Sequence, residues 1–421
     1  MFRKKFIKRY PVPAQIKELS SVFFSHGYRL YIVGGAIRDY LLGVENHDFD
    51  FCTSATPEQV MGMFKRVIPT GIKHGTVTIM IENTGYEVTT FRVESSYSDY
   101  RHPDKVYFTS DLEQDLSRRD FTVNAFACDC ETGLIIDLFG GMRDLRCRKI
   151  RCIGVPDERF NEDALRLLRM CRFCSKLDFK ADKKTLKSAE QLSSNIIHVS
   201  AERLHDETNK LLMSDNPQIG LSLMLQTGIL KYIIPEFSDK TTSFDLIVSA
   251  VKTAAQRKSP EDVRWALFFH LFGEDKADVI MKRLKFSNST REKVLILIRN
   301  QKEEYTPEWT DASVKRFINK VGSDNLFSLF EMQMCKKMVL EKSTVYPDYE
   351  EFKKRTEKLK NDPLTLKDLS VDGTDLIKIG VSNGPDIGRI LNILLNEVID
   401  NPGNNTQSYL LSRARQLSSA V

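Results

Sequence analysis

The chain has 421 residues, more than one hydrophobic core usually covers, so we expect roughly two to four packed units. Its 62 basic and 57 acidic residues give a net charge of +5, which favours polyanionic partners only weakly. The chain has no signal-peptide core, and no stretch approaches the roughly 20 apolar residues of a membrane span. We therefore expect a soluble, cytoplasmic protein with no membrane partner.

The eight cysteines lack the paired spacing and partner histidines of a structural zinc site. Cys171 and Cys174 form a CxxC pair, but this pair lies inside an arginine-rich stretch with a helical pattern. Small buried thiols are commoner there than redox centres. We expect all the cysteines to be reduced.

The first 150 residues contain short runs typical of β-strands with a few helices between them. The expected strands are residues 29–33, 48–52, 76–81, 87–91 and 122–128. From about Glu158 onward, apolar residues recur at intervals of three and four, which indicates helices. Stretches rich in turn formers divide this part into modules at 214–220, 300–311 and 360–373. The pattern predicts an α+β head followed by a mainly helical remainder.

The segment from Arg29 to Gly43 predicts a strand, a tight turn at Gly34 and Gly35, and a helix that ends at Gly43. Glycines let the backbone approach a triphosphate, a helix N-terminus offers free N–H groups, and Arg38 adds a positive charge. The signal is weak by itself, because it matches neither a Walker loop nor GxGxxG. A phosphate site and a plain tight turn both stay open.

Asp48 and Asp50 follow shortly after this helix. Two residues apart on an expected strand, their side chains would project from the same face. Adjacent carboxylates repel unless cations neutralise them, and oxygen-only ligands favour Mg²⁺, whose other positions triphosphate and water can fill. Glu87 is a candidate third carboxylate for two metal ions that activate a 3′-hydroxyl and hold the leaving pyrophosphate. An exposed strand edge is the plain alternative.

Residues 117–125 read SRRDFTVNA and concentrate groups suited to holding a nucleotide. Arg119 offers planar donors to phosphate, and Phe121 would anchor the segment in the core. Asp120 and Asn124 have the chemistry to reach ribose hydroxyls or a metal-bound water. A surface Arg-Arg-Asp before a buried strand explains the same residues without a ligand.

A helix expected to begin near Asn161 carries Asp163, Arg166, Arg169 and Arg172 at steps of three, on one polar stripe. In a first turn, Asp163 could simply complement the helix dipole. A more specific use is base selection, because cytosine and adenine both present an amino donor beside a ring-nitrogen acceptor. Asp163 would accept from the first and Arg166 would donate to the second. Uracil and guanine would leave groups unpaired, so no nucleic-acid template is needed.

Five ordered motifs together resemble the class II CCA-adding enzymes, which are tRNA nucleotidyltransferases of the polymerase beta superfamily. They are VGGAIRDYLLG with DFD (33–50), KHGTV with YEVTTF (73–91), RRDFTVNA (118–125), EDALRLLR (162–169) and SAERLHDE (200–207). The resemblance implies an α+β, polymerase-beta-like head followed by three helical parts. The implied boundaries are head 1–145, base-selecting neck 146–210, body 211–310 and tRNA-binding tail 311–421.

The resemblance also implies the reaction and its residues. The reaction is addition of CCA to the 3′ end of tRNA from CTP and ATP, with Mg²⁺ as cofactor and pyrophosphate as product. Metal ligands would be Asp48 and Asp50, and Glu87 and Asp120 join them as candidate catalytic residues. The candidate nucleotide-binding residues are Gly35, Arg38, Arg119, Asn124, Asp163, Arg166, Arg169 and Arg172. A homodimer is left open.

Residues 94–104 resemble the flexible loop with which A-adding members switch from CTP to ATP, which favours full CCA addition. A CC-only enzyme would carry a shortened form of this loop. A poly(A) polymerase would keep the carboxylates of Asp48 and Asp50. A catalytically silent RNA-binding protein would have lost them, and a DxD glycosyltransferase would explain only two aspartates. The C-terminal part shows a partial likeness at 371–377 and 384–388, where the family would hold the tRNA elbow.

Overall fold

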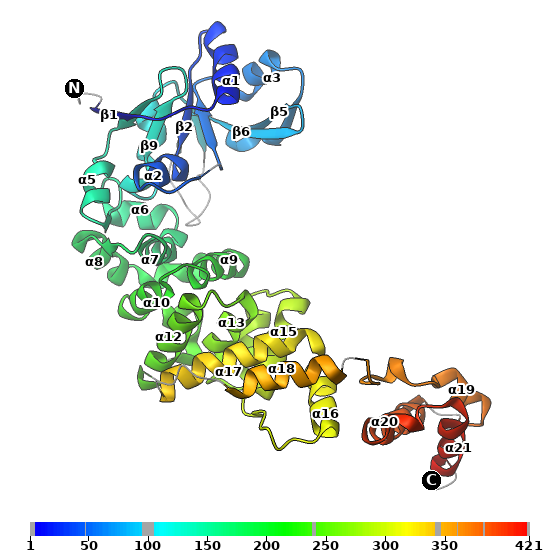
Figure 1. The fold of residues 1–421 in the computed structure, drawn as a ribbon. Helices are drawn as coiled ribbons and strands as arrows, with labels where there is room; N and C mark the ends of the chain where they lie inside the picture. Colours follow the sequence, from blue (N-terminus) through cyan, green and yellow to red (C-terminus); the bar gives the residue numbers. More distant parts are fainter. Residues whose placement is uncertain are drawn as a thin grey trace. The chain divides into compact units, whose positions relative to one another are not determined.

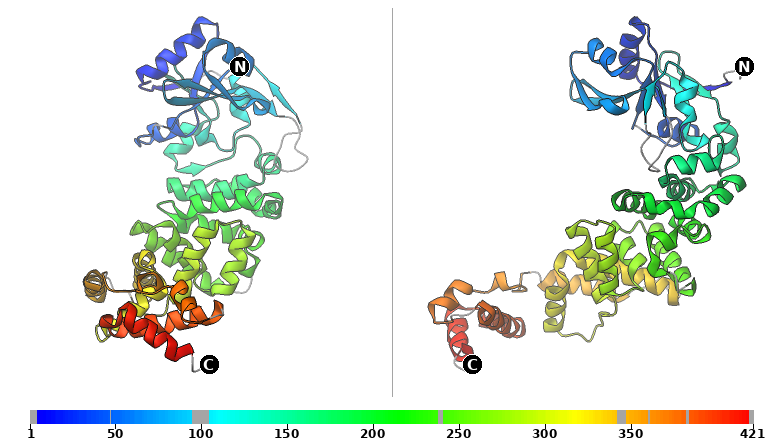
Figure 2. Two further views of the ribbon diagram at one scale, coloured as in Figure 1. Left: turned by 90° about the vertical axis from the view of Figure 1, so that its right-hand side faces the viewer. Right: turned by 180° about the vertical axis from the view of Figure 1, so that it is seen from behind.

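The structure is a computed structural model, and it describes residues 5–46, 48–94, 105–237, 241–341, 347–359, 361–381 and 384–418. The chain divides into two compact units. The first comprises Met1–Phe244 with Arg283–Lys285, and the second comprises Asp245–Lys282 with Phe286–Val421. Figures 1 and 2 show that the strands belong to the first unit, which has α+β architecture, and that the second is helical.

An eight-stranded mixed sheet forms the centre of the first unit, in the order β1-β10-β9-β2-β3-β6-β5-β4 (Figure 1). Its strands are β1 (Lys5–Arg9), β2 (Leu30–Val33), β3 (Asp50–Thr53), β4 (Val67–Gly71), β5 (Thr76–Ile81), β6 (Thr84–Thr90), β9 (Phe126–Asp129) and β10 (Leu134–Asp137). Strands β3 and β6 run parallel, and the other neighbours run antiparallel. Two short ladders pair β7 (Arg92–Glu94) with β8 (Val106–Phe108) and β11 (Lys149–Ile150) with β12 (Lys180–Ala181).

The central strands β2 and β9 are buried along their whole length. Continuous burial fits their sequences, LYIV and FACD, because a strand covered on both faces has no need of alternating polar residues. Helices α1 (Ala14–Ser25) and α2 (Gly35–Leu41) pack against β2. Burial of each large side chain in this core stabilises the fold by roughly 1.5–3 kcal/mol.

The strand predictions are partly right. The run at 76–81 is β5 as expected, and β2 begins one residue after the predicted start at Arg29. The strand predicted at 48–52 is wrong at its start, because β3 begins only at Asp50. The run at 122–128 begins instead with a 3-10 turn, Thr122–Asn124, because local bonds of buried polar side chains compete there with the strand ladder.

The remaining helices of the first unit follow the sheet, and α7 packs between α9 and α10. They are α3 (Pro57–Met63), α4 (Leu112–Ser117), α5 (Gly141–Arg146), α6 (Pro156–Glu162), α7 (Leu165–Leu177), α8 (Lys183–Gln191), α9 (Ala201–Leu212), α10 (Pro217–Gln226) and α11 (Leu230–Ile233). The break predicted at 214–220 is too long, because α10 already begins at Pro217. Gly220 lies inside α10, where a Cβ would meet the carbonyl oxygen of Cys171 at 2.8 Å, so this glycine permits the close approach of α7.

The second unit is built from helices throughout the part that the structure describes. They are α12 (Thr241–Gln256), which begins in the first unit, α13 (Glu261–Phe269), α14 (Glu274–Arg283), α15 (Asn288–Asn300), α16 (Asp311–Val321), α17 (Leu326–Glu341), α18 (Pro347–Leu359), α19 (Gly373–Lys378), α20 (Gly384–Asp400) and α21 (Gln407–Ser418). The breaks predicted at 300–311 and 360–373 are confirmed. The side chains of Thr310 and Asp372 cap the helices that follow them.

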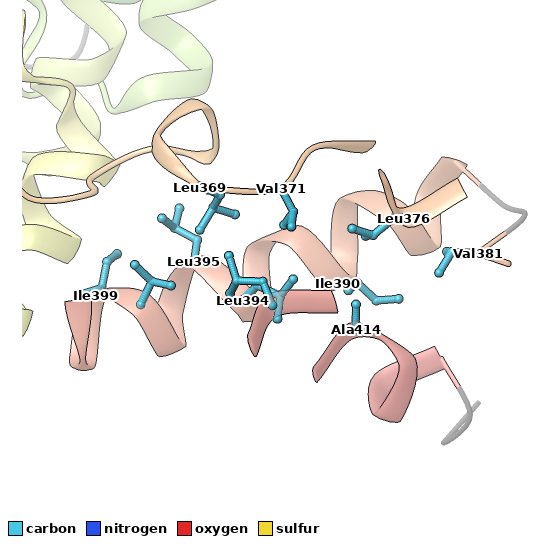
Figure 3. Packing of buried hydrophobic residues seen from close by; sticks show 11 residues of the cluster. Leu369, Val371, Leu376, Val381, Ile390, Leu394, Leu395, Ile399 and Ala414 are labelled. Atoms are coloured by element: carbon cyan, nitrogen blue, oxygen red, sulfur yellow. The ribbon is translucent and has the colours of Figure 1, made fainter. Parts of the chain in front are cut away.

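The last three helices share an apolar core of their own. Figure 3 shows Leu376 of α19, Ile390 and Leu394 of α20, and Ala414 of α21 gathered in one cluster. Leu376 and Leu394 are fully buried. Of the helices that can be described, none is both long and apolar enough to cross a membrane. The predicted α+β head with a helical remainder is confirmed, whereas the finer division at residues 145, 210 and 310 stays a prediction.

Candidate active site

A polar pocket of about 270 Å³ opens beside the β2–α2 turn in the first unit. Its walls come from this turn, the approach to β3, the segment before β9 and the C-terminal half of α7. The lining residues are Gly34, Gly35, Ala36, Arg38, Asn46, Asp48, Asp50, Arg119, Asp120, Asn124, Arg169, Arg172, Phe173 and Lys176. The pocket therefore collects every predicted site residue except Glu87, Asp163 and Arg166.

The expected glycine turn is present between β2 and α2. Gly34 has φ +77° and ψ −131°, a conformation that residues with a side chain rarely adopt. A Cβ there would lie 3.3 Å from Nη1 of Arg119 and 3.8 Å from Oδ2 of Asp50. Glycine is thus required twice, for the backbone conformation and for the space that the two charged side chains occupy. The turn brings the start of α2 against the acidic wall of the pocket.

Asp48 and Asp50 both reach the pocket, but they do not share a strand. Asp48 precedes β3, and its backbone N–H donates to Oδ1 of Asn46 at 2.9 Å. Asp50 is the first residue of β3 and pairs with Val33 of β2. The two carboxylates therefore do not project from one face of a strand, contrary to the prediction. The turn that Asn46 holds brings Asp48 to the same pocket.

Glu87 approaches Asp50 from the neighbouring strand. The parallel register of β3 and β6 pairs Phe51 with Val88, which places Glu87 beside Asp50 one position earlier. Glu87 lines a smaller hollow of about 110 Å³ that Asp50, Asp115 and Arg119 also line. It therefore adds negative charge next to Asp50 without facing the main pocket.

The electrostatics of Asp50 fit a cation site. Asp50 is exposed at the start of β3, yet partial burial raises its pKa, Arg119 acts against this, and the negative charges of Asp48 and Glu87 raise the pKa further. Among the residues with described positions, no group of three or more His, Cys, Asp or Glu side chains encloses one metal position. Two carboxylates would leave most ligand positions of an ion to phosphate and water, the arrangement that Mg²⁺ favours.

Arg118 and Arg119 both approach Asp115, but Arg118 is held much more firmly. Arg118 binds Oδ1 of Asp115 at 2.9 Å and Oε1 of Glu94 at 3.2 Å. Nη2 of Arg119 lies 3.8 Å from Asp115, too far for a strong hydrogen bond, and its buried Nε has no hydrogen-bond partner in the described chain. The guanidinium of Arg119 therefore keeps donors for a ligand, as phosphate binding requires.

A buried network links Asp120 to both sides of the pocket. Nδ2 of Asn124 donates to Oδ1 of Asp120 at 3.0 Å, and Oδ1 of Asn124 accepts from Nη1 of Arg38 at 2.6 Å. Arg169 donates from Nε to Oδ2 of Asp120 at 2.8 Å. Burial alone would raise the pKa of Asp120, but the charge of Arg169 and these hydrogen bonds outweigh it and lower the pKa. Asp120 is thus a fixed anion that positions Arg169, and its catalytic role stays a prediction.

Phe173 of α7 organises three of the cations. Its ring centroid lies 4.0 Å from the guanidinium carbon of Arg172, 5.2 Å from that of Arg169 and 5.5 Å from that of Arg38. These distances fall within the range of cation–π attraction. The ring also packs edge-on against Phe121, which is fully buried as the sequence predicts. The aromatic pair ties the arginines of α7 to the core of the sheet domain.

The helix predicted to begin near Asn161 is interrupted at Asp163. Helix α6 ends at Glu162, Asp163 has an extended backbone with φ −141° and ψ 104°, and α7 begins at Leu165. Oδ1 of Asp163 accepts from the backbone N–H of Leu165, the first residue of α7, at 3.1 Å. The prediction of one continuous stripe is wrong at its first residue, although Arg166, Arg169 and Arg172 do lie on α7.

The proposed base-reading pair is held by partners that the sequence analysis missed. Arg203 of α9 donates to both carboxylate oxygens of Asp163, at 2.8 and 3.2 Å. Arg166 donates to Oε2 of Glu162 at 2.6 Å and to the carbonyl oxygen of Arg118 at 2.8 Å. One signal was available, because Arg203 lies in the SAERLHDE motif, whose residues received no role. A second residue of that motif, Glu207, binds Arg172.

A larger hollow of about 570 Å³ lies in the second unit. Its lining is mainly apolar and includes no acidic side chain. Cys171 and Cys174 are buried on α7, and burial raises the pKa of Cys174 to about 12. The polar pocket in the first unit is therefore the candidate active site.

The mixed sheet, the glycine turn and the two aspartates beside it define the class of polymerase-beta-like nucleotidyltransferases. Three family matches cover most of the chain. The poly(A) polymerase head domain matches residues 30–151, the probable RNA- and SrmB-binding site of polymerase A matches 178–241, and the putative tRNA nucleotidyltransferase domain 2 matches 257–414. The match to the poly(A) polymerase head domain therefore agrees with the nucleotidyltransferase fold of the first unit.

Known proteins resemble the chain over nearly its whole length. The CCA-adding enzyme of Lactococcus lactis subsp. cremoris (strain SK11) is 35% identical over 421 residues, covering 98% of this chain and 97% of that one. That of Ligilactobacillus salivarius (strain UCC118) is 35% identical over 424 residues, with the same coverage. The crystal structure of the Bacillus stearothermophilus CCA-adding enzyme in complex with CTP matches with a TM-score of 0.81 and 30% identity, covering 98% of this chain and 100% of that one. The chain belongs to the CCA-adding enzyme family, as its motifs predict, and is a tRNA nucleotidyltransferase.

Proposed function

We propose that the chain adds CCA to the 3′ end of tRNA from CTP and ATP without a nucleic-acid template, and releases pyrophosphate. The chain belongs to the CCA-adding family, and one observation carries this proposal. In the pocket, Asp48 and Asp50 lie across the glycine turn from Arg119, whose guanidinium is only partly paired. One wall can hold a cation and the other can hold phosphate. A nucleoside triphosphate with its metal ion presents this combination of charges.

Asp48 and Asp50 would be the metal ligands, and the raised pKa of Asp50 supports this assignment, since a cation would relieve the repulsion between neighbouring carboxylates. Bound Mg²⁺ would supply Lewis-acid chemistry, lowering the pKa of the attacking 3′-hydroxyl and stabilising the charge on the leaving pyrophosphate. Glu87 would reinforce the negative potential at Asp50 from the adjacent strand. We propose Mg²⁺ because the donors are oxygens only.

Arg119 would orient the triphosphate. Its neighbour Gly34 leaves the guanidinium room, and its incomplete pairing with Asp115 leaves planar donors for phosphate oxygens. Arg38 and Asn124 are already engaged with each other, so we propose that they shape the floor of the pocket and present only their remaining donors to the sugar or phosphates. Gly35 would let the nucleotide approach the backbone closely.

Base selection would fall to Asp163 and Arg166. Arg203 fixes both oxygens of Asp163, and Glu162 fixes the Arg166 guanidinium, so each reading group is held before a base arrives. A preorganised acceptor and donor match the pairing edges of cytosine and adenine and leave uracil and guanine with unpaired groups. We propose that Arg169 and Arg172 support the nucleotide from the following turns of α7.

Full CCA addition is favoured over the CC-only and poly(A) alternatives by family membership. The predicted A-adding loop at 94–104 lies, apart from Glu94, outside the residues that the structure describes. We further propose that the enzyme works in the cytoplasm and that the helices of 311–421 bind tRNA.

The test is incubation of the purified protein and Mg²⁺ with a tRNA transcript that lacks its terminal CCA, with CTP, ATP or both, followed by sequencing of the product ends. We expect growth by CCA and then a stop. A halt at CC with both nucleotides present would assign the CC-only activity, and a long A tail would assign poly(A) polymerase.

A further inference from the structure

Lys176 lines the active-site pocket from the last turn of α7, four residues after Arg172. No motif of the sequence singles out this lysine. A lysine in the last turn of a helix is favoured by the helix dipole wherever it points, by roughly 0.3–1 kcal/mol. Its position is therefore informative only through its surroundings in the pocket.

Three arginines of the same pocket are already neutralised by carboxylates. The pairs are Arg38 with Asp39 at 2.6 Å, Arg169 with Asp120 at 2.7 Å, and Arg172 with Glu207. The three carboxylates are all buried, so these ion pairs hold their partners firmly. These guanidinium groups therefore add little uncompensated positive charge for a ligand.

Lys176 differs, because its ammonium group forms no ion pair or hydrogen bond with any residue that the structure describes. The carboxylate that attracts it is Asp39, whose oxygens already accept from Nε of Arg38 at 2.7 Å and from Nδ2 of Asn46 at 2.9 Å. Lys176 is exposed overall, but partial burial still lowers its pKa, as do the nearby charges of Arg38 and Arg172, while Asp39 acts against this. An anion bound in the pocket would compensate this charge.

We propose that Lys176 binds the phosphate chain of the incoming nucleotide and that it is, with Arg119, a principal cation left for this purpose. The inference rests on the proposed function and names the part of the substrate that the α7 wall of the pocket recognises. An RNA backbone phosphate is the other chemical source of such an anion. The triphosphate is favoured because Lys176 shares one pocket of about 270 Å³ with the glycine turn and the aspartates.

The test compares equilibrium binding of CTP, pyrophosphate and CMP by the full chain and by Lys176→Gln and Lys176→Arg. Loss of one charged contact to phosphate corresponds to about tenfold weaker binding. We expect Lys176→Gln to bind CTP and pyrophosphate about tenfold more weakly and CMP nearly as well as the wild type does. Lys176→Arg should restore most of the CTP affinity. Lys187→Gln is the matched control, because Lys187 is an exposed lysine of α8 outside the pocket.

The KM for tRNA, measured in parallel, separates the two phosphate sources. Unchanged binding of CTP and pyrophosphate by Lys176→Gln would overturn the proposal and leave Lys176 as a helix-end lysine. A raised KM for tRNA with unchanged CTP binding would also overturn it, in favour of an RNA phosphate. The binding experiments need no turnover, so they remain decisive even if the wild type fails to extend tRNA, a result that would refute the proposed function separately.

Discussion

Replacement of Arg203 by methionine should relax base selection without removing either base-reading residue. Arg203 holds both oxygens of Asp163, at 2.8 and 3.2 Å, and methionine keeps much of its apolar volume on α9. In Arg203→Met, the Asp163 carboxylate would keep only its bond to the Leu165 amide, at 3.1 Å. It would therefore be free to turn away from the edge of the base.

The expected loss of nucleotide preference follows from how exposed the Arg203–Asp163 ion pair is. Charge-assisted hydrogen bonds contribute roughly 1.5–3 kcal/mol when buried. The Arg203 and Asp163 side chains are 25% and 19% exposed, so we take the lower end, about 1.5 kcal/mol. Because 1.36 kcal/mol corresponds to a factor of ten, the preference for CTP over UTP should fall about tenfold.

The assay is competition among the four nucleotides on a tRNA transcript, read as the ratio of kcat/KM values. Arg203→Lys should give an intermediate preference, because it keeps the charge but not the two-point hold. Arg299→Met is a control, since the Arg299 pair with Glu274 is exposed in the second unit. A folded Arg203→Met variant with wild-type preference would refute the idea that Arg203 positions Asp163.

Three further predictions concern charge and backbone strain. Asp50→Asn should raise the free energy of unfolding at pH 7, because the pKa of Asp50 is raised in the folded state and folding therefore disfavours the ionised carboxylate. This gain should shrink as pH falls through that pKa, and urea unfolding at several pH values that shows no gain would contradict the prediction. Gly34→Ala should destabilise the fold by roughly 1–3 kcal/mol, because Gly34 has φ +77° and ψ −131°, a region that residues with a side chain rarely adopt, and the methyl group would crowd Arg119. Equal urea midpoints would count against this strain. Burial lowers the pKa of His270 from 6.5 to about 4, so the free energy of unfolding should be highest above pH 6.5 and should fall by about 3 kcal/mol at most as pH drops toward 4. His270→Gln should flatten this part of the stability profile, and an unchanged profile would show that His270 is not its cause.

Local sequence signals predicted the parts of the fold that local physics determines. The alternating run of β5 and the glycine turn before α2 follow from side-chain periodicity and from the need for positive φ at Gly34. The long breaks before α16 and α19 follow from helix-capping residues such as Thr310 and Asp372. These features depend on residues close together in the chain.

Tertiary contacts explain what the sequence could not predict. The start of β3 was misplaced because Asn46 binds the backbone of Asp48 and holds it in a turn. The break at Asp163 depends partly on Arg203, which is 40 residues away and whose charge could have met any of several acids. Glycine-rich and acidic motifs thus located the pocket, whereas the residues that position its side chains became apparent only from the fold.

The most direct test of the central claim is single-turnover extension of a tRNA lacking CCA by the wild type, Asp50→Asn and Asp178→Asn, with tRNA binding measured in parallel. Asp178 is an exposed aspartate with φ +54°, a conformation that asparagine tolerates, so Asp178→Asn is a matched control. We predict wild-type extension by the control and at least a roughly hundredfold loss for Asp50→Asn, with unchanged tRNA binding. Wild-type extension by a folded Asp50→Asn variant would contradict the assignment of this pocket as the site of nucleotidyl transfer.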